Sequence, residues 1–337
     1  MLVLLAVVTI TAWKGYSLYH RIFSPNVAIT EGQSPLIYIH TGAQFSEVRQ
    51  MLVDGGWIKD EASFLWVARL KKYDQLVKPG RYRLKKGMSN EELVNMLRSG
   101  NQEPLRVSFN NIHTPEQLAG ILGHSLEPDS LDFLKGLKGN KGLAGKGIHW
   151  GQAFFTCFPN SYDFYWTTDV EKFLSIMLKH YLQFWTDERV NKAEAMGFSV
   201  KEVTILASIV EMESWKRDEQ PTVAGVYINR LKTGMRLQAD PTVIYAVGDF
   251  SIRRVNSNHL DIDSPYNTYR YSGLPPGPIC LPSQDALKSV LNYKKHDYYY
   301  FCAKEDLSGY HVFSKTYDQH LQNRRRYQQA LDRMNIH

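Results

Sequence analysis

SVKEVTILASIVEME, residues Ser199 to Glu213, is the stretch that decides the fold of the C-terminal part of the chain. It opens with Ser199-Val200-Lys201-Glu202, the pattern of a capping box, in which a hydroxyl and a carboxylate satisfy free N–H groups at a helix start. Apolar residues then recur with helical spacing on two faces: Val203, Leu206, Ala207 and Val210 on one, Ile205 and Ile209 on the other. The pattern predicts a helix that is buried nearly all round.

Two glutamates close this helix, and Glu211 comes directly after the apolar run. A carboxyl group there is poorly hydrated, which disfavours its charged form and suits it to donate a proton near neutral pH. The alternative is that Glu211 and Glu213 mark the point where the helix reaches solvent and pair with Lys216 and Arg217. Because residues two apart lie far apart around a helix, the two carboxylates cannot face one substrate. We predict that one carboxylate carries the chemistry, and that it is Glu211.

The N-terminal segment is apolar from Met1 to Trp13 except for two threonines, and Lys14 interrupts it. A spanning helix needs about 20 apolar residues, so this run is short. No basic segment precedes it and no small-residue cleavage site follows it, which argues against a cleaved signal peptide. We predict a single membrane anchor over residues 1–23; a buried N-terminal helix of a soluble protein is the alternative.

Length and composition bound the rest of the chain. The sequence has 337 residues, of which 43% are hydrophobic and 22% charged, as in globular proteins, and its length favours two domains after the anchor. The net charge of +6 is compatible with an anionic partner such as a cell-wall polymer, a membrane surface or nucleic acid. The only dense basic run, Arg324 to Arg326, is expected to be a solvated helix face, so we predict no nucleic-acid partner.

The three cysteines, Cys157, Cys280 and Cys302, form no C-x-x-C pair, and no histidine cluster has metal-ligand spacing. We therefore expect no zinc or other metal, no cofactor and no catalytic cysteine. Outside the cytoplasm two of the three could pair, and the spacing does not say which.

The remaining patterns predict an α+β fold. Leu36 to His40 and Gly80 to Leu84 alternate as strands, with amphipathic helices between them, which indicates a small α/β module over residues 35–105. Further along, Asp240-Pro241 has the form of an N-cap followed by proline at the first helical position. Near the C-terminus a hairpin is expected, followed by a basic helix.

Several blocks, in order, resemble the endolytic murein transglycosylases of the MltG (YceG-like) family. These are Ala207 to Glu213, Val226 to Leu231, Met235 to Tyr245, Tyr266 to Tyr269, Gly273 to Ile279 and Pro282-Ser283. Upstream, Lys78 to Tyr82 with the following helix is similar to the family's LysM-like region. The resemblance covers nearly the whole chain and divides it into an anchor over 1–23, a LysM-like module over 35–105 and a YceG-like catalytic domain over 106–337.

The resemblance implies a single-pass protein of the inner membrane whose catalytic domain lies on the periplasmic face and cuts nascent peptidoglycan strands. The bond would be the β-1,4 link between N-acetylmuramic acid and N-acetylglucosamine, and the product would end in 1,6-anhydro-N-acetylmuramic acid. Penicillin-binding proteins of the elongation or division machinery could be its partners. The family's catalytic glutamate falls on Glu211. A hydrolase normally needs two carboxylates, but here the sugar's own 6-hydroxyl attacks C1. One residue can then protonate the leaving O4 and later accept the proton of that hydroxyl.

Motif position also suggests the groups that contact the substrate. We predict that Gln238, Asn267 and Tyr269 bind it, with Glu213 and Arg236 as supporting or subsite residues. Two alternatives stay open: a non-catalytic peptidoglycan-binding scaffold of the wall-synthesis machinery, and a glycoside hydrolase. A hydrolase would need a second carboxylate, for which the candidates are Asp240, Asp261 and Asp263. Other hydrolytic classes are poorly supported, since the chain has no Gly-x-Ser-x-Gly, Ser-x-x-Lys or His-Glu-x-x-His motif.

Overall fold

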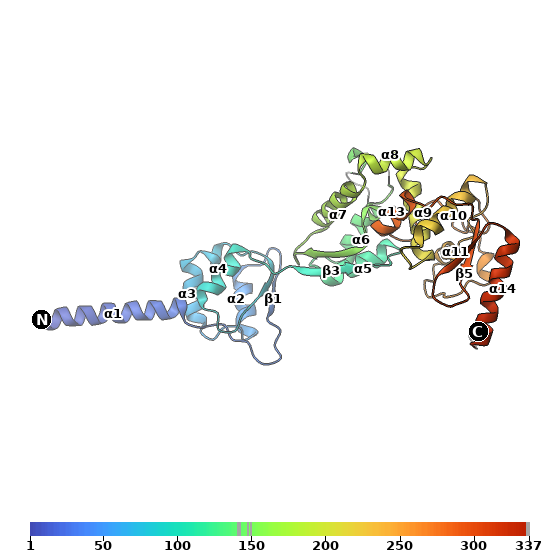
Figure 1. Cartoon of the computed structure of the whole chain (residues 1–337). Coiled ribbons are helices and arrows are strands. Elements are labelled where there is room, and N and C mark those ends of the chain that lie inside the picture. Colours follow the sequence, from blue (N-terminus) through green and yellow to red (C-terminus); the bar gives the residue numbers. More distant parts are fainter. Residues whose placement is uncertain (140–142, 147, 149, 335–337) are drawn as a thin grey trace. The chain divides into compact units, whose positions relative to one another are not determined.

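The computed structural model describes residues 1–139, 143–146, 148 and 150–334; the gaps and the last three residues fall within the predicted catalytic domain. The chain divides into two compact units. The first holds residues 1–107, 122–129 and 162–170, and the second holds 108–121, 130–161 and 171–337. Both units combine helices with short two-stranded sheets (Figure 1). The predicted α+β class is therefore confirmed.

The first unit is built on a two-stranded antiparallel sheet flanked by helices. Its elements are α1 (Leu2–Phe23), β1 (Leu36–Ile39), α2 (Phe45–Asp54), α3 (Glu61–Leu70), the 3-10 turn η1 (Tyr73–Gln75), β2 (Gly80–Arg83) and α4 (Asn90–Ser99). Leu36 pairs with Arg83 and Ile39 with Gly80. Buried side chains of the helices and strands, such as Leu52, Phe64 and Leu93, form one core. The strands and helices predicted for residues 35–105 are therefore present; the LysM-like character of this module stays a prediction.

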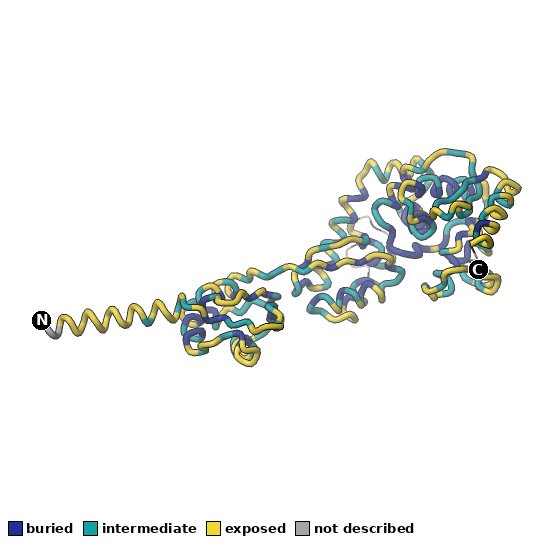
Figure 2. Tube along the Cα trace, turned by 60° about the horizontal axis from the view of Figure 1, so that its bottom comes forward, coloured by how far each residue is buried: buried dark blue, intermediate teal, exposed yellow. Residues whose placement is uncertain are grey.

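The helix α1 is 22 residues long and exposed along most of its length (Figure 2). Among the described residues, no helix combines the length and the apolar character needed to cross a membrane. The anchor predicted over residues 1–23 stays a prediction. The three cysteines are all unpaired, and Cys157 and Cys280 are buried.

A second two-stranded sheet pairs β3 (Leu105–Phe109) with β4 (Asn160–Phe164). The segment between its strands holds α5 (Pro115–Ser125), α6 (Ser130–Lys138), η2 (Ala144–Lys146) and η3 (Ala153–Thr156).

The second unit is organised around α9 (Val200–Glu213), which packs against α10, α11 and α13 (Figure 1). Its other elements are α7 (Val170–Phe184), α8 (Asp187–Ala195), α10 (Gln220–Lys232), α11 (Asp240–Val247), α12 (Ser257–Leu260), α13 (Gln284–Leu291), β5 (Tyr300–Ala303), β6 (His311–Ser314) and α14 (Tyr317–Arg333). The predicted capping box is present, since Ser199 and Glu202 each accept a hydrogen bond from the other's backbone N–H. Every residue of α9 from Val203 to Val210 is buried, as the two apolar faces predict.

Candidate active site

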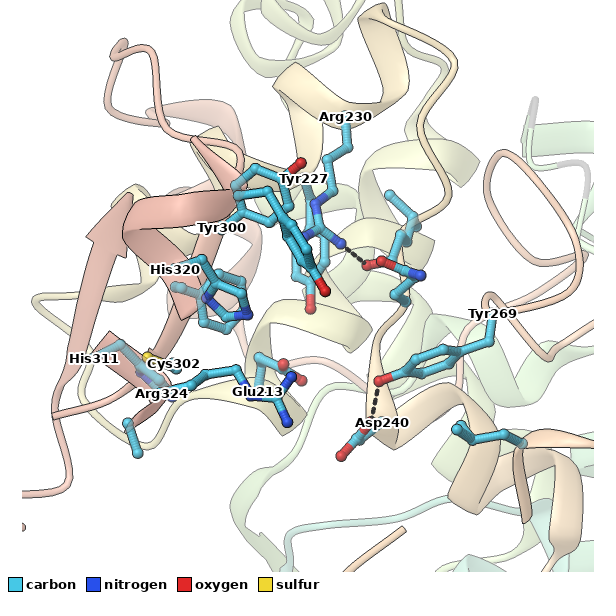
Figure 3. A pocket seen from close by; sticks show the side chains of 16 residues that line it. Glu213, Tyr227, Arg230, Asp240, Tyr269, Tyr300, Cys302, His311, His320 and Arg324 are labelled. Carbon is cyan, nitrogen blue, oxygen red and sulfur yellow. Dashed lines mark hydrogen bonds between the residues drawn. The ribbon is translucent and has the colours of Figure 1, made fainter. Parts of the chain in front are cut away.

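A pocket of about 560 Å³ lies in the second unit, where segments far apart in the sequence meet (Figure 3). One side is formed by the end of α9, by α10 and by the start of α11; the other is formed by β5, β6 and α14. The lining residues used below are Glu213, Tyr227, Arg230, Gln238, Asp240, Tyr269, Tyr300, Cys302, His311, His320 and Arg324. A polar pocket of this size can enclose a substantial part of an extended ligand.

Glu213, the last residue of α9, is a carboxyl group of this pocket whose pKa is strongly perturbed. Burial raises the pKa of its carboxyl group to about 8, and the nearby charge of Asp240 raises it too. A hydrogen bond from Tyr227 and the charge of Arg230 lower that pKa in part. The carboxyl group is therefore mostly protonated at neutral pH and can act as a general acid.

Asp240 lies in the same pocket and is held by Tyr269. The Tyr269 hydroxyl donates to Asp240 Oδ1 over 2.5 Å, and burial followed by this bond raises the pKa of Tyr269. The helix α11 begins at Asp240 with Ala239 as its N-cap, so the prediction of Asp240 as the cap was wrong by one residue. Its side chain instead meets Tyr269, which leaves a carboxylate close to Glu213.

The backbone before α11 is tied to the loop that carries Tyr269. The N–H of Gln238 donates to the Thr268 carbonyl oxygen over 3.1 Å, and the N–H of Ala239 donates to Thr268 Oγ1 over 3.0 Å. Gln238 lines the pocket with φ of 49°, in the left-handed region that non-glycine residues seldom adopt. Such strained positions concentrate at functional sites, where the surrounding structure holds them.

Arg230 joins the two sides of the pocket. Its Nε donates to the Tyr299 carbonyl oxygen over 2.7 Å, and its Nη1 donates to that of Leu237 over 2.6 Å. The guanidinium group also lies 5.4 Å from the ring centre of Tyr300. Because the side chain is buried, these bonds compensate its desolvation and fix the position of both walls.

The opposite wall presents rings held in place by their neighbours. Tyr300 and His320 stack with ring centres 5.4 Å apart. The buried carboxylate of Glu219 accepts hydrogen bonds from the backbone N–H of His311 over 2.8 Å and from its Nδ1 over 2.7 Å, which fixes the orientation of that imidazole. Aromatic faces with polar edges suit a sugar, which needs both stacking and hydrogen bonds.

Glu211 lies elsewhere. It lines a separate pocket of about 340 Å³, where its Oε2 accepts hydrogen bonds from the backbone N–H of Ser283 over 2.9 Å and from the Ser283 hydroxyl over 2.6 Å. Ser283 is the N-cap of α13. Glu211 therefore supports the start of a neighbouring helix. Glu211 and Glu213 line different pockets, as expected from their positions around α9.

The other predicted site residues are divided. Gln238 and Tyr269 lie in the pocket with Glu213, whereas Asn267 and Arg236 do not line it. Asn267 is buried and its amide donates to the carbonyl oxygens of residues 260 and 262, each over 2.9 Å. Arg236 donates to the Tyr269 carbonyl oxygen over 3.0 Å and so supports the loop. Of the three aspartates considered for a hydrolase, Asp240 alone lines this pocket among the described residues, and Asp261 and Asp263 do not.

Sequence reasoning missed Tyr227, Arg230 and the residues of β5, β6 and α14. Tyr227 and Arg230 are three apart on α10, which places them on one helix face; that spacing was a usable signal. No local pattern links them to the C-terminal hairpin. Within the described part of the chain, no three His, Cys, Asp or Glu residues are grouped so as to hold a metal ion.

A carboxyl group with a raised pKa in a polar pocket, beside a second carboxylate, is an arrangement that acid catalysis uses. Comparison with known proteins gives the family: the chain belongs to the YceG-like family, whose sequence model matches residues 37–326. The resemblance drawn from the sequence blocks is therefore confirmed.

The chain is similar to the endolytic murein transglycosylase of Bacillus subtilis, with 30% identity over 313 residues that cover 86% of this chain and 84% of the relative. It is also similar to the endolytic murein transglycosylase of Streptococcus pneumoniae, with 29% identity over 304 residues, or 79% of this chain and 53% of the relative. Among solved structures, a yceG-like protein of Listeria monocytogenes matches with a TM-score of 0.57 and 27% identity, over 85% of this chain and 97% of that one.

Proposed function

We propose that this chain is an endolytic lytic transglycosylase that cuts the β-1,4 bond between N-acetylmuramic acid and N-acetylglucosamine, leaving 1,6-anhydro ends. Its enzyme class is that of the murein transglycosylases to which it is similar along most of its length. The observation that carries the proposal is the pocket around Glu213, which is polar, large and holds a carboxyl group protonated at neutral pH.

In this proposal Glu213, rather than the predicted Glu211, is the catalytic acid. Glu213 has the raised pKa and shares its pocket with Asp240, Tyr269 and Gln238, whereas the carboxylate of Glu211 is engaged by the cap of α13. Glu213 protonates the glycosidic O4 as the bond to C1 breaks. The resulting carboxylate then accepts the proton of the 6-hydroxyl group as that oxygen attacks C1. The proton that leaves the enzyme in the first step returns in the second, so no water is consumed.

Asp240 supplies the negative charge that favours the developing positive charge at C1. The bond from Tyr269 keeps its carboxylate on the side of the pocket that Glu213 occupies. The same observation supports a second candidate function: two carboxylates in one pocket are also what a glycoside hydrolase requires, with Asp240 as nucleophile or base. The two functions differ in the chemical form of the new end.

The location and partners are further parts of the proposal. Peptidoglycan strands are the substrate, and a site outside the cytoplasmic membrane follows from where that polymer is found. An inner-membrane location and contact with penicillin-binding proteins stay predictions, as they were from the sequence.

The test is mass analysis of the ends released from purified peptidoglycan by this protein and by its Glu213→Gln and Glu211→Gln variants. We expect anhydro ends from the unchanged protein and from Glu211→Gln, and none from Glu213→Gln. Reducing ends would favour the hydrolase with Asp240. Cleavage that survives in Glu213→Gln but is lost in Glu211→Gln would return the catalytic role to Glu211, and absence of cleavage by all three would favour the scaffold.

A further inference from the structure

The C-terminal helix α14 presents one face to the active-site pocket. Tyr317, His320 and Arg324 line it, and their spacing of three and then four residues places them on one side of the helix. Arg325 follows immediately and does not line the pocket. Arg324, Arg325 and Arg326 are all exposed, as expected of a solvated helix face, and Arg324 in addition lines the pocket, where Figure 3 shows it among the lining side chains.

Arg324 is the arginine of this pocket whose N–H donors the described residues leave unused. Within the described residues, no carboxylate lies at ion-pair distance from its guanidinium group, and no acceptor bonds to it. Arg230, by contrast, uses its donors on the carbonyl oxygens of Tyr299 and Leu237. Arg324 is also exposed to solvent, so that a ligand entering the pocket can reach it.

The charges around it leave an excess of positive charge. Glu213 is mostly protonated at neutral pH, so among the lining groups only Asp240 opposes the two arginines. Burial, together with the charges of Arg324 and Arg230, lowers the pKa of His320, which keeps that imidazole neutral. The Nδ1 atom of His320 is buried without a hydrogen-bond partner among the described residues. The α14 wall thus offers an exposed cation four residues from a ring nitrogen without a hydrogen-bond partner.

We propose that Arg324 and His320 form a subsite for a carboxylate group of the glycan substrate, which makes Arg324 a specificity residue of this enzyme. This rests on the proposed function, since it assumes that the pocket holds a peptidoglycan strand. An arginine guanidinium binds carboxylates with paired N–H donors, and a neutral imidazole adds one further hydrogen bond. A sugar polymer without carboxylates would leave both groups unused.

Peptidoglycan offers this chemistry in two places. N-acetylmuramic acid carries a lactyl carboxyl group that is free in strands stripped of peptide, and it is amide-linked where a stem peptide is attached. The stem peptide itself then carries carboxylates. Both sources present the same group to Arg324, and they are separated by comparing stripped strands with uncrosslinked peptide-bearing strands.

The experiment measures equilibrium binding of fluorescently labelled strands to the Glu213→Gln background, which prevents turnover. Each strand type is used as such and after its carboxylates have been converted to amides. We expect the free-carboxylate form of at least one strand type to bind about fivefold more tightly than its amide, the upper range for an exposed ion pair. Adding Arg324→Gln should remove the difference, and adding Arg325→Gln should preserve it.

A difference that persists in the Arg324→Gln variant, or no difference in the Arg324-containing protein for either strand type, overturns the subsite. Circular dichroism of both arginine variants checks that α14 stays folded. The strand type that shows the difference identifies the source of the carboxylate. If strands bind with this preference but the unchanged protein releases no new ends, the proposed reaction fails while the subsite stands.

Discussion

Replacing the proposed catalytic carboxyl group, that of Glu213, is expected to stabilise the protein while it abolishes cleavage. Glu213 has a pKa raised from 4.5 to about 8 by burial and by Asp240. Between these two values the folded state keeps the proton that the unfolded chain has already lost. The free energy of unfolding therefore falls as pH rises through this window, by about 1.4 kcal/mol per pH unit. Two and a half units separate pH 4.5 from pH 7, so the loss at pH 7 is about 3 kcal/mol.

Glu213→Gln does not titrate and keeps the neutral, hydrogen-bonding form at every pH. The variant should match the unchanged protein near pH 4.5 and exceed its free energy of unfolding by about 3 kcal/mol at pH 7. The difference should level off above pH 8. Urea unfolding of both proteins at pH 5, 7 and 9 measures it. A difference that is constant across these pH values would refute the reasoning, because it would mean that folding does not perturb the ionisation of Glu213.

Three other substitutions test the surroundings of the site. Glu211→Gln should keep turnover and lose about 1 kcal/mol of unfolding free energy, because the cap of α13 loses a charged acceptor; a matching loss of turnover at full stability would contradict its structural role. Tyr227→Phe removes a hydrogen bond that lowers the pKa of Glu213, so the alkaline limb of the pH–rate profile should move above about pH 8. If the limb does not move, this hydrogen bond does not control the pKa of Glu213. Arg230→Gln should cost about 2 to 3 kcal/mol of unfolding free energy by leaving buried carbonyl oxygens unpaired, whereas Arg236→Gln at the surface, its control, should cost under about 1 kcal/mol.

Local chemistry predicted most of the elements of the second unit. The capping box at Ser199 and the apolar positions of α9 gave its start and its burial. The hairpin expected near the C-terminus is present as β5 and β6, with Tyr300 paired with Ser314. These features depend on residues within a few positions of one another, so a single sequence contains them.

Which glutamate faces the pocket could not be read from the sequence. Both sides of α9 are apolar, so the pattern does not say which neighbour covers each side. The answer depends on Asp240, Arg230 and α14, which are brought together only by the packing of helices distant in the sequence. The motif position of Asn267 suggested that it contacts the substrate. In the structure its side-chain NH2 group instead donates to two backbone carbonyl oxygens. Hydrogen-bond partners of this kind become visible only in three dimensions.

At the end of α9, the angular position of a residue around the helix axis determines which pocket its side chain faces. Glu211 and Glu213 stand about 200° apart around the helix, one at the cap of α13 and the other in the candidate active-site pocket. Inserting or deleting one residue within the helix would turn both carboxylates by about 100° and remove each from its place. Point substitutions on the apolar faces alter packing at one position, but a change of length misaligns two sites at once. The length of this helix is therefore constrained by both sites, and this constraint is not visible in the identity of any single residue.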